Sequence, residues 1–170
     1  MTEPEVWLRG ALPDVPPLLQ PVAHSLLQCR EEVLGALRDL TPAQLWARPG
    51  GAASAGYHAR HAAGSLDRLL TYARGEGLSP AQREALASEG APDLEDGAAE
   101  RIADAYARAI ARALDQVRTT EERTLLERRG VGRVQLPSTV IGLLFHAAEH
   151  TQRHAGQLVT TAKIVRGLAL

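Results

Sequence analysis

The chain has 170 residues, of which 45% are hydrophobic and 23% charged, a composition typical of a folded domain and not of a disordered chain. Its 19 basic and 20 acidic residues give a net charge of −1, so no basic excess exists to neutralise a nucleic-acid backbone. The single cysteine, Cys29, excludes an internal disulfide and a cysteine-based structural zinc site. We therefore expect one soluble domain over residues 1–170 that binds no nucleic acid.

The sequence shows no targeting or membrane segment. Its first residues have neither the positive start nor the apolar stretch of a secretory signal. The longest uncharged stretch, between Arg133 and Glu149, is too short to cross a bilayer and contains a proline. A cytoplasmic protein without a membrane partner is the expectation.

The first elements are an irregular leader, a long helix and a short helix. Four prolines within residues 1–17 predict the leader. Residues 18–40 carry apolar side chains at helical spacing and predict the first long helix. Thr41 followed by Pro42 predicts the start of a short helix, and Pro49 with the two glycines after it predicts a break.

Two more long helices and another short one follow. Ser54 is a predicted N-cap, and the apolar stripe behind it continues to about Gly75 or Gly77. Ser79, which precedes a proline, predicts a second short helix. A third long helix is predicted over residues 97–119.

The last part of the chain contains an extended connection and the fourth long helix. Residues 121–137 are charged and glycine-containing, and Ser138 is the predicted cap of a helix that ends near Arg166. Four amphipathic helices without a convincing strand pattern predict an all-α protein, a four-helix bundle over residues 18–168. Because two connections are long, we expect crossovers in place of a plain up-down ring.

Five of the six histidines fall in two clusters, on the second and fourth long helices: His58, His61, His146, His150 and His154. Neighbouring histidines on the fourth helix are one turn apart, so each pair can hold one metal ion. The outer two of these three lie about 12 Å apart and cannot share an ion. A third ligand must therefore come from elsewhere. Helical projection slightly favours His58 over His61 and leaves the choice open.

Two motifs resemble the DinB/YfiT-like superfamily of four-helix-bundle metalloproteins. Residues 54–64, which read SAGYHARHAAG, resemble the signature of that superfamily's second helix. Residues 146–157, which read HAAEHTQRHAGQ, resemble the more specific signature of its fourth helix. The likeness extends over roughly residues 18–168.

The resemblance implies a three-histidine metal site. It assigns the ligands to His61, His150 and His154, with water or substrate completing the coordination. His58 and His146 are extra to the simplest family pattern. We interpret His146 as a hydrogen-bonding partner or pocket wall, and His58 as a rival for the third ligand.

The resemblance also implies a function. The better understood members are transferases or isomerases that use a low-molecular-weight thiol, and their metal lowers the pKa of that thiol. A neutral, all-nitrogen ligand set suits zinc, nickel, iron or manganese, of which zinc and nickel are favoured here. A small-molecule substrate and a homodimer are the implied partners.

Two alternatives remain. Residues 146–150 match the H-x-x-E-H pattern of metal-dependent hydrolases, but no acidic residue follows Glu149 to complete the ligand set. Glu149 also projects about 100° away from His150 on the helix. The other alternative is a non-catalytic stress or regulatory protein whose histidines are structural.

Overall fold

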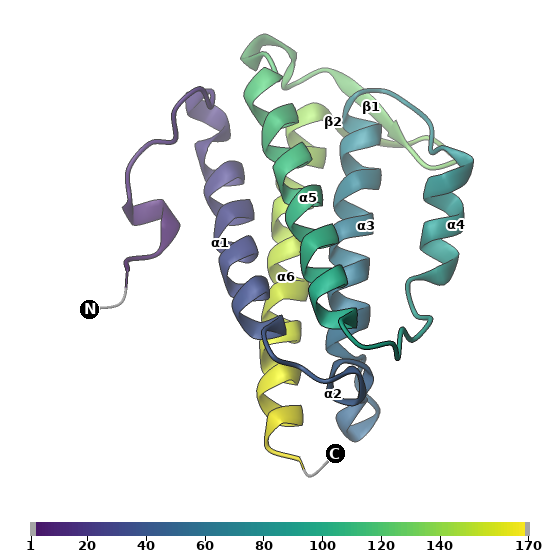
Figure 1. Cartoon of the computed structure of the whole chain (residues 1–170). Helices are drawn as coiled ribbons and strands as arrows, with labels where there is room; N and C mark the ends of the chain where they lie inside the picture. The colour runs from purple at the N-terminus through teal and green to yellow at the C-terminus, as the bar shows by residue number, and fades with distance from the viewer. Residues whose placement is uncertain (1–2, 169–170) are drawn as a thin grey trace.

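Four long helices account for most of the computed structural model, which describes residues 3–168 (Figure 1). They are α1 (Gln20–Leu37), α3 (Ala55–Ala73), α5 (Ala98–Thr119) and α6 (Val140–Arg166). The short helices α2 (Pro42–Trp46) and α4 (Pro80–Ser88) interrupt the connections on either side of α3. The all-α prediction is confirmed. No helix within residues 3–168 combines the length and apolar character needed to cross a bilayer.

A β-hairpin replaces part of the predicted irregular connection. Strand β1 (Arg128–Val131) pairs antiparallel with β2 (Leu136–Thr139). The expectation of no strand was therefore wrong here. Each strand has only four residues, too few for an alternating apolar pattern. The turn between them places Gly132 and Gln135 at positive φ, 70° and 51°, where glycine is the more favoured residue.

Helix caps explain where the elements begin. The hydroxyls of Thr41, Ser54 and Ser79 accept backbone amide hydrogen bonds, as predicted. The fourth long helix differs, because its cap is Thr139 and not the predicted Ser138. Ser138 lies inside β2, where its backbone is extended and paired, so the helix can begin only after the strand.

The first long helix is shorter than predicted. A 3₁₀ turn at Pro17–Leu19 precedes α1, and α1 ends at Leu37 and not at residue 40. Asp39 has a φ of 59°, which is incompatible with a continuing right-handed helix. Ahead of α1, the leader packs onto the body through the buried side chain of Val6, whose amide donates to Gln28 Oε1 at 3.0 Å.

The long helices form two parallel pairs. Arg166 of α6 donates to the carbonyl of Ala36 in α1 at 2.9 Å, so the carboxyl ends of these helices lie together. Gln116 of α5 donates to the carbonyl of Leu70 in α3 at 3.0 Å, which places α3 and α5 parallel. Besides its parallel partner, each helix packs against one helix of the other pair, α1 against α5 and α6 against α3. Because α3 and α5 are parallel, the connection through α4 has to return the chain along the length of α3 before α5 begins (Figure 1). This agrees with the predicted crossovers.

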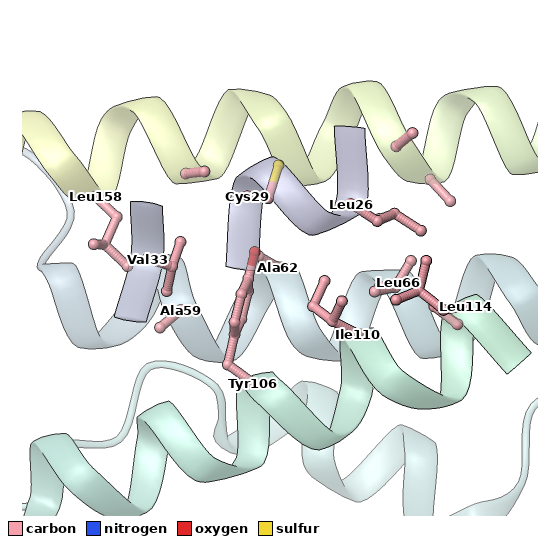
Figure 2. Packing of buried hydrophobic residues seen from close by; sticks show 14 of the residues in the cluster. Leu26, Cys29, Val33, Ala59, Ala62, Leu66, Tyr106, Ile110, Leu114 and Leu158 are labelled. Carbon is pink, nitrogen blue, oxygen red and sulfur yellow. The ribbon is translucent and has the colours of Figure 1, made fainter. Parts of the chain in front are cut away.

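The core lies between the four long helices, and Figure 2 shows part of it. Tyr106 of α5 is its largest fully buried side chain. Cys29 of α1 is also fully buried, and its thiol donates to Gln152 Oε1 at 3.3 Å. Burial raises the pKa of Cys29 to about 12. The chain's single thiol is therefore protonated and enclosed at neutral pH.

Candidate metal centre

The antiparallel packing of α3 and α6 brings histidines from the two helices together. The Nε2 atoms of His61 and His150 lie 3.2 Å apart. One nitrogen from each of His61, His150 and His154 lies within 4.8 Å of the other two. Two nitrogen ligands of a tetrahedral zinc ion are about 3.3 Å apart when each bond is about 2.0–2.1 Å. These three side chains are therefore close enough to hold one metal ion.

Small residues allow this approach of the two backbones. Ala59 and Ala62 flank the histidines of α3, and Ala147 and Ala155 flank those of α6. All four alanines are buried. Their short side chains let the helices pack closely, so that imidazoles from opposite helices meet.

The environment favours the neutral form of His58, His150 and His154. Burial lowers the pKa of His58 and His150, and charge on His61 would lower both further. The same two causes lower the pKa of His154 to about 4. A neutral imidazole presents one lone pair, which is the form that binds a metal.

Glu89, which sequence reasoning missed, connects the site to the segment after α4. It is 6% exposed, and its Oε2 accepts a hydrogen bond from His61 Nδ1 at 2.7 Å. Its Oε1 accepts from Arg68 Nη1, also at 2.7 Å. Because Nδ1 of His61 carries the donated proton, Nε2 is left with the lone pair, facing His150.

The arrangement around Glu89 explains why residue 64 is a glycine. A Cβ at Gly64 would lie 2.8 Å from Arg68 Nη1 and closer still to the carboxylate of Glu89. Glycine therefore leaves the space that the buried ion pair occupies. The reason for a glycine at this position is apparent only when the position of Glu89 is known.

The two extra histidines take different places. His58 is buried, and its Nδ1 lies 3.0 Å from Nδ1 of His154, which leaves Nε2 of His154 free of this contact. His146 is half exposed, donates to Glu149 Oε1 at 2.7 Å, and has its ring centroid 5.4 Å from that of His150. The geometry groups His61 with His150 and His154 of α6. His58 lies outside this group and contacts His154.

Two further features suit a site that another group completes. Nδ1 of His150 is buried and has no hydrogen-bond partner among residues 3–168, which is costly for a polar atom. Tyr57 stacks on His61, with ring centroids 5.4 Å apart and planes 12° from parallel. The nitrogen donor set, the buried unpartnered atom and the carboxylate behind His61 all fit a bound divalent metal.

The fold and the site together define a helical protein with a three-histidine cluster that can bind a metal ion. Residues 25–158, well over half of the chain, match the model of the DinB superfamily, and the chain belongs to that superfamily. This match confirms the resemblance drawn from the two histidine motifs. None of the curated proteins compared with the chain matches it.

Proposed function

We propose that His61, His150 and His154 hold one divalent metal ion. The observation that carries this proposal is the grouping of their nitrogens within 4.8 Å. Three nitrogen ligands leave room in the coordination shell, which is typical of catalytic metal sites. Zinc and nickel suit this donor set best, and iron and manganese are the other candidates.

We infer further that the protein transfers or isomerises a small molecule with a low-molecular-weight thiol as the nucleophile. When bound, the metal ion supplies Lewis-acid chemistry that favours the thiolate at neutral pH. Glu89 keeps the proton of His61 on Nδ1 and fixes the orientation of the ring. Cys29 is enclosed and protonated, so the reacting sulfur comes from the cosubstrate. The homodimer implied by the resemblance and the cytoplasmic location expected from the sequence remain predictions.

A non-catalytic protein is the second candidate, because the histidines also contact one another. The pair His61 and His150 and the pair His58 and His154 lie within hydrogen-bonding distance, at 3.2 and 3.0 Å. Such bonds pair one nitrogen of each imidazole without any ion. The two candidates differ in whether the purified protein holds metal.

The deciding experiment is elemental analysis of untagged protein purified without chelator. We expect about one metal ion per chain, lost in His150→Ala and kept in the matched variant His24→Ala, whose histidine lies on α1 outside the cluster. Absence of metal from the wild type, even after reconstitution, overturns the proposal. The histidines would then be structural.

A further inference from the structure

A cavity of about 480 Å³ lies next to the candidate metal centre. Its lining includes Trp46, Ser54, Tyr57, Gly90 and Pro92. Tyr57 also stacks on His61, so this residue is a shared wall between the cavity and the centre. The volume falls in the range of small-molecule sites, about 300–1,000 Å³.

Trp46 gives the cavity a rigid, flat apolar wall. Its indole Nε1 donates to the carbonyl of Asp93 at 2.8 Å, and the guanidinium of Arg60 lies 4.8 Å from its ring centroid. A Cβ at Gly56 would lie only 3.0 Å from the indole, so the backbone of α3 lies directly against Trp46. Trp46 and Tyr57 together offer aromatic surface to a planar ligand.

Arg48 is the one charged side chain among the lining residues. Its guanidinium contacts only the backbone carbonyls of Gly51 and Ala52, each at 3.4 Å, and has no carboxylate partner among residues 3–168. Within residues 3–168, no acidic side chain lines the cavity. A guanidinium in this state is available to a ligand carboxylate, which it binds through paired N–H donors.

We propose that this cavity binds a small planar carboxylate, with its flat apolar body against Trp46 and Tyr57 and its carboxylate at Arg48. The binding itself depends only on the cavity. The role of the bound carboxylate as the acceptor substrate of the thiol-dependent reaction rests on the proposed function. The ligand of the cavity is then an aromatic or conjugated acid and not a neutral or cationic molecule.

The test uses 2-naphthoate as the probe and Trp46 as the reporter. The chain has two tryptophans, so a Trp7→Phe background leaves the fluorescence of Trp46 alone. We expect saturable quenching, with an affinity that Arg48→Gln weakens about two- to five-fold, the range for an exposed charge contact. The neutral analogue 2-naphthalenemethanol should bind Arg48→Gln and the parent equally. Arg108→Gln on α5 makes the same charge change at an exposed position outside the cavity and should behave as the parent.

The outcomes separate this proposal from the proposed function. Naphthoate binding is measured again in His150→Ala, and we expect it to persist because none of the described residues that line the cavity is a histidine. If the wild-type protein holds no metal even after reconstitution but still binds naphthoate, the metal-site proposal fails and this one stands. The proposal is overturned if naphthoate gives no saturable quenching. Equal affinity in Arg48→Gln, with an unchanged circular dichroism spectrum, overturns it as well.

Discussion

The Glu89 carboxylate lies between the guanidinium of Arg68 and the imidazole of His61. A carboxylate that accepts from the distal nitrogen of a ligating histidine fixes its tautomer and makes it a stronger donor to the metal. Because Glu89 is almost fully enclosed, this contact is little screened by solvent. Glu89 is therefore a positioning residue for the proposed site.

Glu89→Gln tests that role. The substitution keeps the shape but removes the charge, so the hydrogen bond to His61 becomes weaker and the guanidinium of Arg68 loses its counter-charge. We expect metal affinity to fall about ten- to hundred-fold, as is usual when such a partner is changed. Competitive titration with a metal indicator measures the change. Glu84→Gln, at an exposed position of α4, is the control, and equal affinities in the two variants would contradict the assignment.

The neutral histidines predict a pH dependence for the metal-free protein. The pKa of His154 is about 4 in the folded chain against an ordinary value of 6.5, so between these values the unfolded chain binds a proton that the folded chain does not. The free energy of unfolding should therefore fall as the pH decreases through this window. Urea denaturation at several pH values measures it. His154→Gln should flatten the dependence and the remote His24→Gln should not; parallel curves for all three proteins would count against it.

The histidine part of the site was predictable because its pattern is local. His150 and His154 are one helical turn apart, so the sequence itself places them on one face. Projection could not choose between His58 and His61, since both lie on the same flank of α3. That choice depends on how α3 and α6 pack. Glu89 was not predictable, because it reaches His61 through a tertiary contact across 28 positions.

At the scale of elements, α4 is attached to the bundle by polar contacts. No residue of α4, all of which the structure describes, is buried. Gln82 donates to Asp67 Oδ2 at 2.6 Å and to Thr71 Oγ1 at 2.8 Å, and it completes the capping box with Ser79. A helix held without apolar burial opens more readily than the core helices.

Gln82→Ala should loosen α4 without unfolding the bundle. The variant loses the capping contact and both bonds to α3, so we expect amide exchange in α4 to become about ten-fold faster. The global free energy of unfolding should change by less than about 1 kcal/mol, because no core side chain is altered. Hydrogen exchange read by mass spectrometry and urea denaturation measure the two quantities. Glu84→Ala is the matched control, and unchanged exchange in Gln82→Ala would refute the attachment.

Most elements were predictable, and the exceptions have physical causes. The long helices show the 3.6-residue apolar period, and Thr41, Ser54 and Ser79 mark starts through hydroxyl caps. The hairpin was missed because its stability comes from cross-strand pairing and not from a local apolar pattern. Ser138 and Thr139 are equally good caps by residue type, and only the strand decides between them.

At the scale of the whole molecule, the core encloses a hydroxyl group that lacks the hydrogen bond usual for a buried polar atom. The hydroxyl of Tyr106 is buried and has no hydrogen-bond partner among residues 3–168. Figure 2 shows its side chain reaching from α5 to the region of Ala62 and Cys29, where the bundle is otherwise apolar. An unpaired buried hydroxyl lowers stability, because its hydrogen bond to water is lost on folding.

Tyr106→Phe should therefore stabilise the protein. We expect the free energy of unfolding to rise by about 1 kcal/mol, because the phenyl ring keeps the packing and removes the unpaired group. Urea denaturation measures the change. Tyr72→Phe, at a partly exposed position, is the control and should have little effect. A loss of stability in Tyr106→Phe would instead show that the hydroxyl is bonded in solution.

The enclosure of Cys29 has a practical consequence at the bench. It is the chain's sole sulfhydryl and is 0% exposed, so a folded sample adds no quickly titrating equivalent when an Ellman-type reagent counts sulfhydryls. In an assay of the proposed reaction, any sulfhydryl equivalent consumed would then belong to the added low-molecular-weight thiol, with no blank to subtract. In buffer without added thiol, the rate at which Cys29 is slowly modified reports how often the whole core opens.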